Sequence, residues 1–185
     1  AFVTYNISNA SYGVVDGQQR LTTITIALCA IRDKYKELGF DAPAKGVNRL
    51  IVTRDLDDKS QFVLKAETSY PYFQSQIQSL DKEHDDIEIG TEETALRDAY
   101  ELLSKYVADG VLAIHAQGKD PAKTKVAVKK WLDQIRDKLL SLKVISITLD
   151  NQDDAYLIFE TLNTRGKDLR KSCKTLRNVW YMSAC

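Results

Sequence analysis

The apolar residues change their period near residue 17, and that change constrains the fold more than any other feature of the sequence. Apolar and polar residues alternate, as in a strand, over Phe2–Ile7 and again over Tyr12–Val15. From there apolar residues recur with the period of a helix, and Gly39 is placed to end that helix. The helical stripe consists of Leu21, Ile24, Leu28, Ile31, Tyr35 and Leu38. We therefore expect two short strands that lead through a tight turn into a long amphipathic helix.

The remainder of the chain is mainly helical. In chain order we first expect a strand over Asn48–Thr53, a partly helical segment over Phe62–Leu80 and an acidic loop over 81–93. Two helices should follow, one capped by Thr91 and one over Pro121–Leu142. A strand over Val144–Leu149 and a helix from Asp153 to Leu162 complete the order. This order predicts an α+β domain over residues 1–169 with a helical insertion or subdomain at about 66–142.

Composition excludes little. Lys plus Arg and Asp plus Glu both number 26, so the net charge of zero gives no bulk electrostatic argument for a nucleic-acid or membrane partner. The three cysteines, Cys29, Cys173 and Cys185, are widely spaced and favour reduced thiols, with Cys29 in the core. The sequence contains no signal peptide and no apolar stretch approaching the roughly 20 residues that cross a bilayer. A cytoplasmic location without membrane contact is the expectation.

The turn between the second strand and the long helix is the first candidate for chemistry. It reads Asp16, Gly17, Gln18, Gln19 and Arg20. The backbone N–H groups and dipole of a helix start form an anion site, and glycine lets a ligand approach the backbone closely. An arginine adds a planar fork suited to phosphate, and the glutamines can orient a phosphate, a base or a water. The aspartate could hold a metal ion, orient the arginine or act as a base.

The same turn also fits a purely structural role. Asp16 would then pair with Arg20, and the two glutamines would be solvated. Because a short motif is only a hypothesis, the turn taken alone favours this structural interpretation.

A second candidate lies at the end of the last expected helix. Ala155, Ile158, Phe159 and Leu162 are expected to form its buried face. Asn163 and Gly166 tolerate left-handed backbone, so the chain should turn sharply there and present Asn163, Arg165 and Lys167 near the helix end. This segment is either a capped helix terminus or a second loop that faces a phosphate, and taken alone it favours the capped terminus.

The two segments together resemble a known family. VVDGQQRLTTITIALCAIRD, followed more than a hundred residues later by DDAYLIFETLNTRGKDL, is similar to the N-terminal domain of GmrS/GmrD-type, modification-dependent restriction endonucleases, which act in phage defence. The resemblance runs from Phe2 to about Leu169. It implies a ParB/sulfiredoxin-like small mixed sheet with a helical insertion.

The resemblance also implies a function. The domain would bind and hydrolyse a nucleoside triphosphate, with Mg²⁺ as the expected cofactor, and would license DNA cleavage by an HNH-type nuclease domain or subunit. DNA would be an indirect partner. By matching position, Asp16, Arg20 and Arg165 would be catalytic, whereas Gly17, Gln18, Gln19, Asn163 and Gly166 would bind the nucleotide. Whether Asp16 positions water or a metal ion stays open.

The chain also departs from the family in three ways. A segment with Gln-Arg and aromatic residues that usually precedes the first strand is expected to be missing, so the domain is expected to be incomplete at its N-terminus. Residues 170–185 are basic where the family continues with an acidic, apolar helix, and they resemble an atypical tail. A nuclease motif rich in His and Asn is absent from the sequence. A module that binds nucleotide or DNA without hydrolysis is therefore the alternative function.

Overall fold

The computed structural model describes residues 1–8, 11–81, 87, 89–164 and 180–183. Helices and strands are mixed along the chain, and the strands form a five-stranded and a two-stranded sheet. The predicted α+β class is therefore confirmed. The ParB/sulfiredoxin-like topology stays a prediction, because it rests on the resemblance.

The five-stranded sheet starts from a hairpin. β1 (Phe2–Ser8) pairs antiparallel with β2 (Ser11–Asp16), and β6 (Ser146–Leu149) runs parallel to β1. β7 (Trp180–Ser183) lies between β2 and β5 (Leu64–Ala66) and is antiparallel to both, which gives the order β5-β7-β2-β1-β6. Strands from the two ends of the chain therefore form the middle of this sheet.

The long helix α1 (Gln18–Glu37) follows β2 and packs into the core. Its buried side chains include Leu28, Ile31 and Tyr35 of the expected stripe, and Cys29 is buried, as predicted. The helix begins at Gln18, earlier than the apolar period indicates, because its first turn is polar and does not contribute to the stripe.

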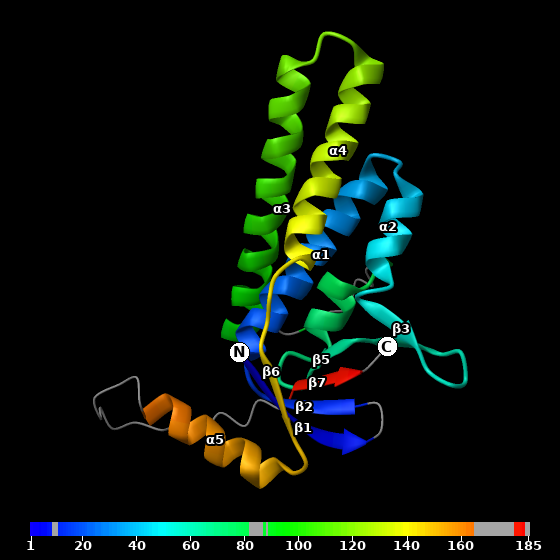
Figure 1. Ribbon diagram of the computed structural model, residues 1–185. Helices are drawn as coiled ribbons and strands as arrows, with labels where there is room; N and C mark the ends of the chain where they lie inside the picture. The colour runs from blue at the N-terminus through cyan, green and yellow to red at the C-terminus, as the bar shows by residue number, and fades with distance from the viewer. Residues whose placement is uncertain (9–10, 82–86, 88, 165–179, 184–185) are drawn as a thin grey trace.

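Two further helices form an antiparallel hairpin against α1, α3 (Thr91–Gln117) and α4 (Pro121–Leu140) (Figure 1). The Asp120 side chain caps α4 by accepting a hydrogen bond of 2.9 Å from Ala122 N. The hairpin packs closely because a Cβ at Gly110 of α3 would overlap with the Trp131 ring of α4. The helical hairpin and α1 form a helical layer on one side of the sheet, and α1 contacts the sheet at β5.

The segment between α1 and α3 differs from the expectation in two places. Asn48–Thr53 is not a strand: α2 (Asp41–Asn48) is helical, and β3 (Val52–Arg54) starts only at Val52. The sequence hides α2 because it is short and contains Pro43. That proline lies in the first helical turn, where its missing N–H has no intrahelical partner to lose.

The expected partial helix over Phe62–Leu80 begins much later than predicted. β4 (Ser60–Phe62) pairs with β3, β5 pairs with β7, and only η1 (Phe73–Gln78) is helical. Local propensity does not predict β5, because its hydrogen-bonded neighbour comes from the far end of the chain.

The π-helical turn η1 also covers the edge strand. The Gln74 side-chain amide donates to the Ala66 carbonyl oxygen at 3.0 Å, and Gln78 donates to that of Leu64 at 3.0 Å. Both glutamines are buried. These bonds occupy carbonyl groups of β5, so this edge offers less template for another strand.

Candidate functional site

The predicted turn joins β2 directly to α1 at Gly17. This glycine adopts φ 95° and ψ 7°, the left-handed conformation that favours glycine, and its carbonyl accepts the first helical hydrogen bond from Leu21 N at 2.9 Å. The N-cap makes no side-chain hydrogen bond, and the first turn holds no acidic residue. The positive end of the α1 dipole is therefore not neutralised within the helix itself.

Asp16 and Arg20 meet across this turn. Arg20 Nη2 lies 3.1 Å from Asp16 Oδ1 and 3.0 Å from Oδ2. The side chains are 52% and 31% exposed for Arg20 and Asp16 respectively, so the pair faces solvent. The Arg20 guanidinium also lies 5.7 Å from the centroid of the Phe2 ring, within the range of a cation–π contact. The arginine is thus held at the surface with a defined orientation.

The two glutamines have different surroundings. Gln18 is half-buried and donates from Nε2 to the Val14 carbonyl oxygen at 2.8 Å, which ties the start of α1 back to β2. Gln19 is exposed. The expectation of two solvated glutamines in a purely structural turn therefore fits Gln19 but not Gln18.

The second predicted segment is described only in part. Asn163 lies in the last turn of α5 (Gln152–Thr164), whereas Arg165 and Gly166 lie outside the described residues. Ala155 is buried, and Ile158 and Phe159 are half-buried, in agreement with the expected inner face. Lys167 also lies outside the described residues.

The topology returns α5 to the end of the sheet that carries Asp16. Phe2 pairs with Ser146 at the start of β6, and Val3 pairs with Asp16 at the end of β2. α5 follows β6 directly and packs back against β1, β2 and β6 on the face opposite the helical layer. Its 13 residues span about 20 Å, longer than the short strand before it. In Figure 1 the C-terminal end of α5 points toward the end of the sheet where β1 starts.

The donor set of the turn suits one kind of metal site. Asp16 is its carboxylate, and the described residues contain no group of three His, Cys, Asp or Glu side chains that could hold a metal ion. Mg²⁺ commonly takes one or two carboxylates and completes its shell with phosphate oxygens and water. The residues therefore fit a metal ion that binds together with a nucleotide, and they do not form a protein cage.

A buried arginine was missed by sequence reasoning. Arg32 of α1 is fully buried, and its guanidinium donates to the carbonyl oxygens of Ile77 at 3.2 Å, Gln78 at 2.5 Å and Ser79 at 3.4 Å. Carbonyl groups at a helix end have no intrahelical partners. Arg32 therefore caps the C-terminal end of η1, and its position three residues before Tyr35 on the buried stripe is the signal that could have revealed it.

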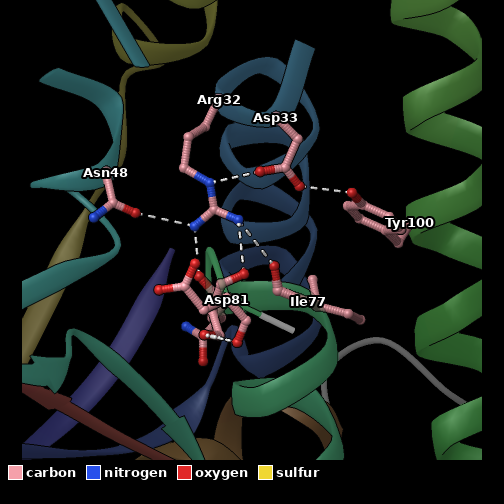
Figure 2. Close-up of polar contacts among 8 residues, drawn as sticks. Arg32, Asp33, Asn48, Ile77, Asp81 and Tyr100 are labelled. Carbon is pink, nitrogen blue, oxygen red and sulfur yellow. Dashed lines mark hydrogen bonds and ion pairs between the residues drawn. The ribbon is translucent and has the colours of Figure 1, made fainter. Parts of the chain in front are cut away.

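The same guanidinium links three other elements (Figure 2). Arg32 Nε donates to Asp33 Oδ1 at 2.8 Å, and Nη1 donates to Asn48 Oδ1 of α2 at 3.1 Å. The other oxygen of Asp33 accepts from the Tyr100 hydroxyl of α3 at 2.6 Å. Burial and this hydrogen bond raise the pKa of Tyr100. The network holds α1, α2, α3 and η1 together and has a structural role.

Comparisons with known proteins place the chain in a family. None of the described helices combines the length and apolarity needed to cross a membrane. No curated protein and no solved structure matches the chain. Residues 1–180 match the family described as the GmrSD restriction endonuclease, N-terminal domain, and the match extends into the segment expected to be an atypical tail. The chain belongs to this family of restriction endonuclease N-terminal domains.

Proposed function

We propose that this domain binds and hydrolyses a nucleoside triphosphate and thereby controls DNA cleavage by a nuclease domain or subunit of its restriction system. Family membership supports the role in restriction. One observation carries the nucleotide site: the fold returns α5 to the sheet end where β2 passes through Gly17 into α1. This topology supports a site in which the segment after α5 approaches the start of α1, a position that favours anions.

We assign each residue of the turn a role in phosphate binding from its chemistry. The N-terminus of α1 and the Arg20 guanidinium would bind the terminal phosphates, and Gly17 would let the phosphates approach the backbone. Asn163, Arg165 and Gly166 would complete the phosphate site from the other segment. Gln18 keeps the helix start fixed to β2, and exposed Gln19 can orient water or phosphate.

Catalysis would consist of water attack on the terminal phosphorus, with release of phosphate. Positioned positive charge is the main contribution that a protein makes to this reaction, and Arg20 and Arg165 would supply it. Asp16 would orient the water or ligate Mg²⁺. A bound Mg²⁺ would neutralise part of the phosphate charge.

Phosphate release from ATP, GTP, CTP and UTP in the presence of Mg²⁺ tests the proposal. Wild type should release phosphate from at least one of them, and Arg20→Ala should lose about 100-fold or more of that rate. Arg97→Ala is the matched control, because Arg97 is also an exposed arginine paired with an aspartate, Asp98, at 3.5 Å. Equal rates in the two variants would reject the assignment of Arg20.

Binding without turnover is the second outcome that the experiment separates. If folded wild type binds a triphosphate through Arg20 but releases no phosphate, the domain is a nucleotide-binding module. In both cases Arg20 Nη2 must leave the Asp16 carboxylate, or another nitrogen of the guanidinium must reach the phosphate.

A further inference from the structure

A second polar pocket lies beside α2, far from the Gly17 turn. Asn48, on its wall, is bonded to Arg32, which stands 14 residues after Gln18 on α1, or roughly 20 Å along the helix. The pocket has a volume of about 480 Å³. It is lined by Lys45, Asn48, Arg49, Val52, Thr53, Arg54, Ser60 and Leu80. A ligand in this pocket would therefore be separate from the phosphate that we propose at the start of α1.

Among the residues that the structure describes, the lining is basic and contains no acidic residue. Lys45 and Arg49 are four residues apart on α2, so they share one face of the helix and repel each other. Neither forms an ion pair with a described carboxylate. In a chain of zero net charge, two adjacent cations that pair with no described carboxylate create a local positive potential on this wall.

The acidic residues of the neighbouring β3–β4 turn are already engaged. Asp55 accepts hydrogen bonds from Asp57 N, Lys59 N and the Gln61 side chain at 2.9, 2.8 and 2.8 Å. Asp58 pairs with Arg54 at 2.6 Å, where the side chains are 64% (Arg54) and 77% (Asp58) exposed. The turn therefore compensates Arg54 in part, and its carboxylates form no ion pair with Lys45 or Arg49.

The buried network fixes a hydrogen-bond donor in this pocket. Arg32 can only donate, so the Asn48 atom bonded to it at 3.1 Å must be the amide oxygen. The Asn48 nitrogen then points away from Arg32, as Figure 2 shows, and makes no hydrogen bond to a described residue. The pocket thus combines two cations that pair with no described carboxylate, an oriented amide donor and the hydroxyl groups of Thr53 and Ser60.

We propose that this pocket binds a backbone phosphate of duplex DNA. Cations, an amide N–H and hydroxyl groups are the groups that contact DNA phosphates. None of the described lining residues is an aromatic residue on which a base could stack, which favours a phosphate in a nucleic-acid backbone over a whole nucleotide. The chain belongs to a family of restriction endonuclease domains, so DNA is a ligand of the right class. The proposal does not depend on nucleotide hydrolysis at Arg20.

Fluorescence anisotropy with a labelled duplex of about 20 base pairs tests this site. Lys45→Gln/Arg49→Gln should weaken binding about tenfold or more at moderate salt, between roughly 50 and 200 mM KCl, and reduce the slope of log K against log salt by nearly 2. Lys130→Gln/Lys138→Gln removes the same charge from exposed positions on α4 and should leave both quantities close to wild type.

Asn48→Asp tests the effect of the pocket on DNA binding separately from its effect on stability. Its carboxylate still accepts the hydrogen bond from Arg32, so the melting temperature should not fall, but it replaces the donor with a negative charge. DNA affinity should therefore fall as in the double variant. If wild type binds no DNA, or if the pocket and α4 variants bind it equally, the proposal is wrong.

A competition arm with inorganic phosphate and ATP distinguishes the sources of the phosphate group. If the pocket variants lose affinity for these anions but keep DNA affinity, the pocket serves a free anion and the DNA assignment is overturned. Nucleotide hydrolysis measured on the same variants should be unchanged. Failure of the Arg20 proposal and failure of this one therefore give different results.

Discussion

The ring of Phe2 lies directly against Gly17, so closely that a Cβ on the glycine would overlap with the ring. The Arg20 guanidinium lies over the same Phe2 ring, 5.7 Å from its centroid. The first strand of the sheet thus supports the turn between β2 and α1. The geometry of the candidate site depends on this contact as well as on the backbone of the turn.

Gly17→Ala should destabilise the protein by about 1–3 kcal/mol. The alanine would be strained at φ 95°, and its methyl group would displace Phe2. Urea unfolding followed by circular dichroism measures the change.

Alanine substitutions at two other glycines distinguish the cost of backbone strain from the cost of overlap with the Phe2 ring. Gly39→Ala is also strained, at φ 73°, but nothing lies within 4 Å of the added Cβ, so its cost should be smaller, about 1 kcal/mol. Gly46→Ala lies inside α2 with open space around it and should stabilise by up to about 1 kcal/mol. Equal losses at Gly17 and Gly39 would show that the Phe2 contact contributes nothing.

Arg32→Met should cost about 3–5 kcal/mol, because it leaves Asp33 without its buried partner and three carbonyl groups without donors. Arg32→Lys should recover only a small part of the loss, since a single ammonium group cannot span five acceptors. Thermal melts of both variants test this expectation. Lys36→Met, at an exposed position of the same helix, should stay within about 0.5 kcal/mol of wild type.

Arg20→Ala should change the free energy of unfolding by no more than about 0.5 kcal/mol. The Asp16–Arg20 pair is exposed and solvent-screened, so it adds little to stability. A double-mutant cycle with Asp16→Asn and Arg20→Ala, measured by urea unfolding, gives the coupling energy directly. A coupling above about 1 kcal/mol would mean that the pair is structural and that lost activity in Arg20→Ala reflects damage to the fold.

Acid should weaken the contact between α1 and α4. Partial burial acts to raise the pKa of Asp133, but hydrogen bonds from Lys129 and Tyr35 and nearby positive charge outweigh it, so this pKa is lowered. A lowered pKa contributes stability above the unfolded value of about 4, and this stability is lost as the pH falls through the folded value.

The pH dependence of the melting temperature tests this assignment. Wild type should lose its advantage over Asp133→Asn as the pH falls below about 4. Tyr35→Phe removes one of the three hydrogen bonds to Asp133 and leaves those from Lys129 and Arg136, so it should reduce the advantage at neutral pH only in part. A constant difference between wild type and Asp133→Asn from neutral to acid pH would contradict the assignment.

Local patterns predicted the elements that carry their own period. Two strands, α1 and the α3–α4 hairpin follow from residue spacing, because each buries a regular face against one neighbouring layer. The exact end of one helix differs from the expectation, because Gly90, not Thr91, is the N-cap of α3.

The short elements were not predictable in the same way. Ile51 is buried in the turn after α2, although the apolar run around it resembles a strand. β5 exists because β7 pairs with it, and the partner strand follows more than a hundred residues later. Arg32 carries the charge of a surface residue but lies on a buried face, and the three carbonyl groups at the end of η1, with Asp33 and Asn48, make that position favourable.

The sequence by itself determined the α+β class, the long helices and the local order strand, glycine turn, helix around Asp16 and Arg20. These features depend on contacts within a few residues or on one regular apolar face. Tertiary structure alone decided that Phe2 supports Gly17, that α5 returns to the end of the sheet that carries Asp16, and that Arg32 orients Asn48. Those relationships join residues far apart in the chain, and local periodicity carries no information about which distant groups will satisfy each other's charge, volume and hydrogen bonds.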